Sequence, residues 1–173
     1  DYHKNNAWSY AKEKTSLNDE YVSSNHEYLG IGSGGFSFLG GELFVNAFNL
    51  QKYNEKIQNG KSSVIARCEF NPKERIKYLF LTEIFSGFID IDKFNQTNNT
   101  NLLKTLNLEL KLLDIIGAIE IQNNSIKSTQ FGRYLWLSLI KEFYTGMDKV
   151  RAIFKDDAKL KNSSKINIMK SEI

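Results

Sequence analysis

The chain has 173 residues, of which 41% are hydrophobic and 13% aromatic, enough to form the packed core of one ordinary domain or two small ones. The 23 basic and 20 acidic residues leave a net charge of +3, so the sequence lacks the concentrated positive charge of a nucleic-acid-binding protein. A single cysteine, Cys68, excludes an intramolecular disulfide, and no apolar run is long enough for a membrane span or a signal peptide; together these features predict a cytoplasmic protein.

The first 26 residues hold aromatic side chains among polar ones. Trp8–Ala11 and Tyr21–Val22 have the composition of short strands, and the residues between them favour a turn. The histidines, His3 and His26, have no cysteine or carboxylate at metal-ligand spacing around them. We therefore expect no metal site in this segment.

A glycine-rich stretch follows at residues 28–41, where six of the eleven glycines alternate with apolar side chains. Glycine allows positive φ and close approach of a neighbouring group. The stretch lacks both a helix directly after the glycines and a following Gly-Lys-Ser/Thr, so it is not a typical phosphate-binding loop. It predicts two strands, 29–39 and 42–47, joined at Gly40-Gly41, with a bulky group packed against them.

A helix is expected at 50–59, because Asn49 is a suitable N-cap and Gly60 a suitable C-terminal stop. Val64-Ile65-Ala66 then resembles a strand. The neighbouring Arg67 and Cys68 suggest no reactive site, since a lone cysteine in such a setting is usually a small, partly buried side chain.

The second half predicts a series of capped helices. Asn71-Pro72-Lys73-Glu74 combines an N-cap, proline at the first helical position and a glutamate that closes a capping box, so a helix should run to Ser86. Asp90 caps a short helix to Phe94, and a third helix is expected at 101–116 with a leucine stripe and Gly117 at its end.

A β-hairpin is predicted next, with strands 118–122 and 125–128 around Asn123-Asn124. Thr129 then caps a last helix to about Thr145. Three helices followed by a hairpin is the order of a winged helix. The sequence thus predicts an α+β fold in three parts: a β segment and helix at 1–60, a winged-helix-like subdomain with a β-hairpin wing at 61–155, and a flexible polar tail at 156–173.

Two segments carry a family resemblance. Glu27–Gly41, with Asn46-Ala47 after it, resembles the G-x-G-x-x-x-S segment of the oxygen-independent coproporphyrinogen III oxidases and their radical S-adenosylmethionine (SAM) relatives, which include haem-associated proteins. Thr129–Trp136 resembles the T-x-x-G-R opening of the last helix of that family, and Lys141–Asp148 a variant of that helix from a haem-associated branch. The likeness spans about residues 7–154.

The resemblance implies SAM and a [4Fe–4S] cluster as cofactors of the full-length enzyme and a tetrapyrrole as its substrate. Such clusters are held by a C-x-x-x-C-x-x-C thiolate trio, whereas this chain has only Cys68. We therefore expect a C-terminal part of a longer enzyme whose glycine-rich segment packs against a radical SAM barrel supplied by preceding sequence. Alone, it should be inactive and bind neither cofactor stably. Oxidation of coproporphyrinogen, haem chaperoning and haem breakdown all remain open.

The resemblance assigns three residues, Gly34, Gly35 and Phe36, to the SAM site, and no catalytic or metal-binding residue. The glycines would let the backbone approach the cofactor, and Phe36 would either pack on the adenine ring or be an ordinary strand residue. Arg133 is a weaker candidate for binding a substrate carboxylate, since an arginine at a helix start is more often a surface or ion-paired side chain.

Two other functions stay open. A nucleic-acid-binding winged helix fits the element order, but the candidate recognition helix carries only Lys104 and Lys111, opposed by Glu109 and Asp114, so it would neutralise few phosphates. The chain is therefore not expected to bind nucleic acid. A protein-docking module is compatible with an enzyme part, and without its barrel the glycine-rich hairpin is expected to seek another surface, including a second copy.

Overall fold

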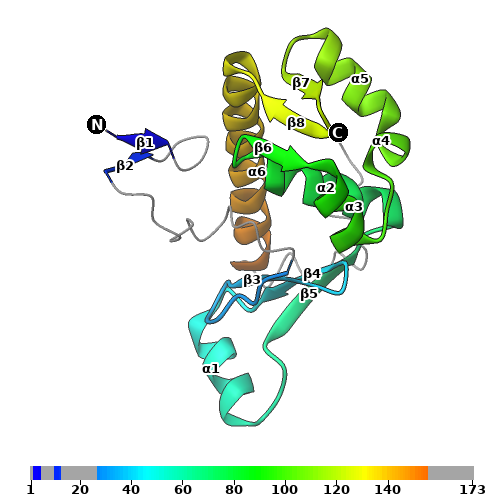
Figure 1. The fold of residues 1–173 in the computed structure, drawn as a ribbon. Coiled ribbons are helices and arrows are strands. Elements are labelled where there is room, and N and C mark those ends of the chain that lie inside the picture. Colours follow the sequence, from blue (N-terminus) through cyan, green and yellow to red (C-terminus); the bar gives the residue numbers. More distant parts are fainter. Residues whose placement is uncertain (1, 5–9, 13–26, 156–173) are drawn as a thin grey trace. The chain divides into compact units, whose positions relative to one another are not determined.

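The computed structural model describes residues 2–4, 10–12 and 27–155 (Figure 1). These residues form two compact units. One unit contains residues 71–141 together with the N-terminal described residues, and the other contains 27–70 and 142–155. Within the described residues, no helix combines the length and the apolar character needed to cross a bilayer.

The unit at 27–70 is built on an antiparallel sheet of order β3-β4-β5, with β3 at Phe36–Leu39, β4 at Glu42–Asn46 and β5 at Val64–Glu69. The predicted turn at Gly40-Gly41 is confirmed, and both glycines have positive φ, 60° and 83°, as a tight hairpin requires. Helix α1 (Leu50–Gln58) is also confirmed, with the Asn49 side chain accepting from the Lys52 N–H.

Two features of this unit differ from the sequence analysis. The predicted strand at 29–39 is wrong over most of its length: only 36–39 is strand, Tyr28 forms an isolated bridge with Phe38, and 29–35 form a loop. Strand β5, which the sequence analysis placed with the following subdomain, pairs with β4 from Glu42↔Glu69 to Asn46↔Val64. The compact unit therefore continues to residue 70 instead of stopping at 60.

The other unit contains α2 to β8 and the first part of α6. Its elements are α2 (Pro72–Ile84), β6 (Phe88–Asp90), α3 (Ile91–Asn98), α4 (Leu102–Thr105), α5 (Asn107–Ile115), β7 (Ile119–Gln122), β8 (Ser125–Ser128) and α6 (Gln130–Lys155). The strands form an antiparallel sheet of order β6-β8-β7. The predicted Asn71/Glu74 capping box is present, and the predicted hairpin turns at Asn123 and Asn124, which both have positive φ.

Several boundaries in this unit were predicted incorrectly. Strand β6, which pairs with β8, was missed because three residues are too few for a periodic pattern. Helix α3 continues to Asn98, whose side-chain amide donates to the Phe94 carbonyl at 2.9 Å, and Asn99, with positive φ, ends it. The single helix expected at 101–116 is divided at Leu106, whose φ of −111° and ψ of 29° are not helical. Helix α6 extends to Lys155, beyond the predicted end at Thr145.

At the N-terminus, part of one predicted strand is present: β2 (Tyr10–Ala11) pairs with β1 (His3–Lys4). The rest of that prediction, Tyr21–Val22, His26 and the tail at 156–173 lie outside the described residues.

Buried apolar residues occur in both units. In the sheet of 27–70, one face buries apolar residues of β3 and β4 and the residue that follows β4: Phe38, Leu43, Val45 and Ala47. In the helical unit, the buried residues come from both its helices and its sheet and include Ile84, Ile89, Leu102, Leu106, Ile126 and Trp136. The Trp136 indole N–H finds a partner in the Ser128 hydroxyl, 2.7 Å away, as a buried tryptophan usually requires.

Candidate functional site

The glycine-rich loop at 29–35 is held in place by side chains that follow it in the sequence. The Asn46 amide donates to the carbonyl oxygens of Gly30 and Gly32 at 3.2 and 3.1 Å and accepts from the Ser63 hydroxyl at 2.9 Å. Asn46 lies where the β4–β5 register shifts, and such an irregularity redirects a side chain. The sequence analysis quoted Asn46 only as part of the resemblance, so its structural role was missed.

Three glycines of the loop, Gly30, Gly34 and Gly35, make close contacts within the chain. An ideal Cβ on Gly30 would lie 2.1 Å from the carbonyl oxygen of Phe36, and one on Gly35 would lie 3.0 Å from the backbone of Gly30. Gly34 has φ of +70°, and a Cβ there would lie 2.7 Å from the ring of Phe48. Since real Cβ atoms do not approach so closely, any larger residue at 30 or 34 would have to displace its neighbour.

An aromatic cluster surrounds this loop. The rings of Phe36 and Phe48 lie 6.1 Å apart with an interplanar angle of 61°, an edge-to-face geometry favoured between aromatic rings. The guanidinium of Arg151 lies 5.8 Å from the Phe48 centroid, within the range of a cation–π contact, and also pairs with Asp148 at 2.8 Å. Phe48 thus joins Gly34, Phe36 and the C-terminal part of α6 within this unit.

The three residues predicted to bind SAM are consecutive in the chain. An ideal Cβ on Gly34 or Gly35 would meet neighbouring atoms of the chain, so both glycines also have a packing role. Gly32 is different: its φ is +93° and no atom lies within 4 Å of an ideal Cβ. Gly32 and Phe36 are both half-buried, and binding of SAM by Gly34, Gly35 and Phe36 stays a prediction.

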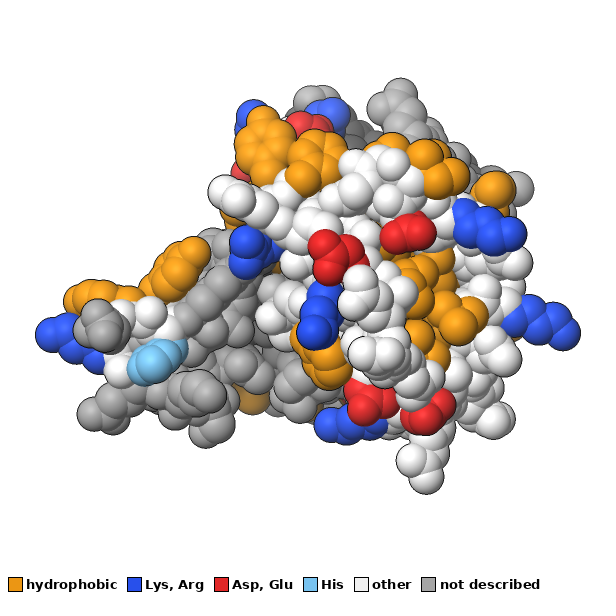
Figure 2. Space-filling model, turned by 45° about the horizontal axis from the view of Figure 1, so that its top comes forward, with side chains coloured by type: hydrophobic (Ala, Val, Ile, Leu, Met, Phe, Trp, Pro, Cys, Tyr) orange, Lys and Arg blue, Asp and Glu red, His pale blue; other side chains and the backbone are white. Residues whose placement is uncertain are grey.

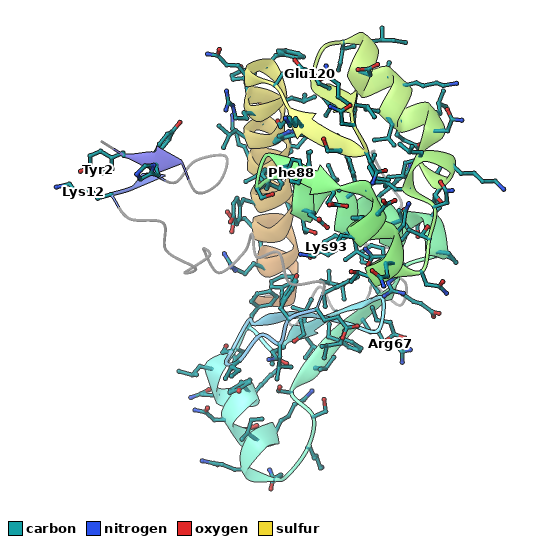
Figure 3. All side chains as sticks on the ribbon, in the orientation of Figure 1. Tyr2, Lys12, Arg67, Phe88, Lys93 and Glu120 are labelled. Atoms are coloured by element: carbon teal, nitrogen blue, oxygen red, sulfur yellow. The ribbon has the colours of Figure 1, made fainter. Side chains whose placement is uncertain are left out.

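The residues available do not fit an iron–sulfur cluster. Among the described residues, no three histidine, cysteine or carboxylate side chains come together as a metal site. Cys68 is partly buried in β5, opposite Leu43. Its neighbour Arg67 points away from β5 and pairs with Glu42 across the sheet (Figure 3). Among the described residues, neither Cys68 nor Arg67 belongs to a group of potential metal ligands.

The second resembling motif, at Thr129 to Arg133, attaches α6 to the β7–β8 hairpin. The Thr129 hydroxyl accepts from the Gly132 N–H at 2.9 Å and donates to the Gly117 carbonyl at 2.6 Å. A Cβ on Gly132 would lie 1.9 Å from the Ala118 carbonyl oxygen. Arg133 is half-buried and, within the described part of the chain, forms no ion pair. Hydrogen bonds thus account for Thr129 and close packing accounts for Gly132, whereas no described contact accounts for Arg133.

Glu109 forms the main charged cluster near α5. It pairs with Lys73 and Lys77 of α2 at 2.9 and 3.0 Å. The hydrogen bond from Lys73, together with a backbone N–H at the start of α5 and the charge of Lys77, lowers the pKa of Glu109 to about 2. Two of the lysines closest to the candidate recognition helix are therefore neutralised within the protein. On the face of the molecule that Figure 2 shows, basic and acidic side chains of the described residues are scattered among hydrophobic ones, without a continuous basic surface.

Glu83 at the end of α2 is the other perturbed carboxyl group. Burial raises its pKa, the charge of Lys93 on α3 (Figure 3) opposes that shift, and Asp90 adds to it. One of its carboxyl oxygens is buried without a hydrogen-bond partner. With one positive and one negative side chain acting on a half-buried carboxyl group, Glu83 is expected to bear on stability.

Neither a family model nor a curated protein matches the chain. It is similar to the solved structure of coproporphyrinogen III oxidase (HemN) from Escherichia coli, a radical SAM enzyme, with 18% sequence identity and a TM-score of 0.49. The match covers 64% of this chain and 26% of that protein, so the chain spans about a quarter of its length. A likeness at this level assigns no activity or site to the chain.

Proposed function

We propose that this chain is the C-terminal, cluster-free part of a radical SAM oxidoreductase of tetrapyrrole metabolism. The observation that carries the proposal is the resemblance of two separated segments, at Glu27–Gly41 and Thr129–Trp136, to the oxygen-independent coproporphyrinogen III oxidases. The packing around both segments supports it. Gly30 and Gly34 permit close contacts in the first segment, and Gly132 permits one in the second, so each motif has a physical reason to keep its glycines.

Some residues in and next to the loop would stabilise its conformation, and others would contact SAM. Gly34, Gly35 and Asn46 would keep the loop folded, while Phe36 and the open side of Gly32 would face SAM in the complete enzyme. The cluster and SAM, bound by the complete protein, would supply the radical chemistry that oxidises the tetrapyrrole. The glycine-rich hairpin would pack against the SAM barrel, and residues 71–141 would form the winged-helix-like subdomain.

A docking module is the second candidate function. It is favoured by the surface of α5, where Leu108, Leu112 and Ile115 are exposed. An apolar helix face is suited to protein partners and is a poor surface for phosphates. The same observation counts against nucleic-acid binding, as does the engagement of Lys73 and Lys77 by Glu109. A docking role is compatible with the oxidoreductase proposal.

The sequence that precedes Asp1 in the gene provides a direct test. The proposal predicts a C-x-x-x-C-x-x-C motif there, in the same reading frame and within strands and helices that alternate as in an α/β barrel. If the preceding reading frame is present and has no cysteine trio, the radical SAM proposal is wrong and the docking function takes its place.

A further inference from the structure

Helix α5 has a second apolar face that is not used by the core of its unit. Leu110 is buried, whereas Leu108, Leu112 and Ile115 have 76%, 58% and 81% of their surface exposed. Their spacing of i, i+4 and i+7 places the three on one side of the helix. Isolated apolar residues at a surface are common, but a continuous helical stripe of this kind is typical of helix–helix packing. We call these three residues the α5 stripe.

The charges beside the α5 stripe are arranged in an ordered way. At about 100° per residue, Lys111 lies about 60° and Asp114 about 120° from the stripe, on the same flank of the helix. Both side chains are exposed, and neither forms an ion pair with another described residue. Glu109 lies on the opposite flank and is already paired with Lys73 and Lys77. The free flank thus carries one positive and one negative charge, one turn apart.

We propose that the α5 stripe is a self-association surface, on which a second copy of this chain packs its own α5 antiparallel about a two-fold axis. In that arrangement Leu108 of one copy faces Ile115 of the other, and Leu112 lies near the axis. A two-fold axis across the helices brings the same flank of both copies together. Lys111 of one copy is then about two residues, or about 3 Å along the axis, from Asp114 of the other.

Charge complementarity favours a second copy over an unrelated partner. Each α5 supplies both the cation and the anion of the contact, so the antiparallel pair forms two Lys111–Asp114 contacts and leaves no net charge at the flank. A partner that recognised lysine alone would leave Asp114 facing its acidic residues, at a cost to affinity. The inference concerns a surface in the unit at 71–141 and does not depend on the proposed oxidoreductase function.

Sedimentation equilibrium of the 173-residue chain over a range of concentrations tests this inference. A reversible dimer is expected, because the buried stripe is small. Leu112→Glu should weaken association at least about tenfold, while Leu50→Glu, at an exposed leucine of α1, should leave it unchanged. Ile31→Gln tests the glycine-rich loop as the contact instead. A monomer at every concentration, or loss of the dimer in Ile31→Gln but not in Leu112→Glu, would overturn the proposal.

Charge-reversed variants identify the partner as a second copy. Lys111→Glu places glutamate opposite Asp114, and Asp114→Lys places lysine opposite Lys111, so each variant alone should associate more weakly than the wild type. Mixed together, the two variants should form a heterodimer, because both contacts then join opposite charges. Circular dichroism serves as the folding control for these exposed positions. If the single variants dimerise as well as the wild type, or if mixing restores nothing, the antiparallel α5 pair is excluded.

Discussion

Gly34 lies directly against the ring of Phe48, so that an ideal Cβ on Gly34 would be 2.7 Å from the ring carbon Cδ1. The two residues are 14 positions apart, and the backbone between them forms the β3–β4 hairpin. The Gly34 N–H also donates to the carbonyl of Ala47 at 2.9 Å. The loop is therefore closed onto the end of β4 by one hydrogen bond and one ring, and the positive φ and the close approach of the ring both favour glycine at 34.

Replacement of Gly34 by alanine should destabilise the unit at 27–70 for two reasons. The positive φ costs about 1–2 kcal/mol for a residue with a Cβ, and the collision with Phe48 adds about 1–3 kcal/mol. Gly32→Ala is the control, because it has positive φ but open space. The free energy of unfolding, measured with urea, should fall further for Gly34→Ala than for Gly32→Ala.

Making Gly34→Ala in a Phe48→Ala variant separates the cost of the positive φ from the cost of the collision with the ring. There, the cost of Gly34→Ala should fall to that of the positive φ alone, giving a coupling energy of about 1 kcal/mol or more between the two sites. Strictly additive effects would show that the Phe48 ring does not limit residue 34.

Two glycines of α6 should respond to alanine in opposite directions. Gly132→Ala places a Cβ against the Ala118 carbonyl oxygen, which is backbone and cannot rotate away, so a loss of about 2 kcal/mol or more is expected. Gly146→Ala meets no atom within 4 Å and should stabilise α6 by about 1 kcal/mol, because alanine favours the helix. Thermal unfolding of both variants provides the measurement. Equal effects would contradict the close contact between α6 and the β7–β8 hairpin.

Glu83→Gln should raise stability at neutral pH. Since burial raises the pKa of Glu83 in the folded protein, the unfolded chain loses this proton first as pH rises, and stability falls from about pH 4.5 up to the folded pKa. Glutamine removes that cost. The gain should shrink as pH falls toward 4.5, where the carboxyl group of Glu83 is also neutral. Glu120→Gln on β7 (Figure 3) is the exposed control, and a gain that is the same at low pH would contradict the assignment.

Glu109→Gln should have the opposite effect. Its pKa is lowered from 4.5 to about 2 in the folded protein, so its contribution is fully present above about pH 4.5 and is lost as pH falls toward 2. Because Lys73 and Lys77 are about half exposed, at 52% and 46%, the loss at neutral pH should be about 1 kcal/mol or less and should decrease with salt. Urea unfolding at pH 7 and pH 2.5, with and without salt, measures it. A loss as large at pH 2.5 as at pH 7 would point to packing instead of charge.

The elements predicted correctly are those whose signals are local. The Asn71/Glu74 capping box, the Gly40-Gly41 turn and the Asn123-Asn124 turn each depend on residues within a few positions, and the structure contains all three. A local signal is sufficient there because the backbone conformation itself selects the residue.

The glycine-rich loop was predicted incorrectly because its conformation is decided by distant residues. Alternation of glycine with apolar side chains resembles a strand, but the Asn46 amide and the Phe48 ring turn residues 29–35 into a loop. No spacing rule connects Gly30 to Asn46. The assignment of Gly34 and Gly35 to SAM rests on the resemblance and stays a prediction, and the structure adds that both glycines have close neighbours within the chain.

Reductive cleavage of SAM by the complete protein is the most direct test of the radical SAM proposal. The complete protein, expressed with the sequence that precedes Asp1, and the 173-residue chain alone should both be treated anaerobically with iron and sulfide, reduced and mixed with SAM, and 5′-deoxyadenosine should be measured. We expect the complete protein to hold a coloured cluster and form 5′-deoxyadenosine, and the 173-residue chain to stay colourless and form none. A complete protein that binds no cluster and leaves SAM intact would contradict the proposal.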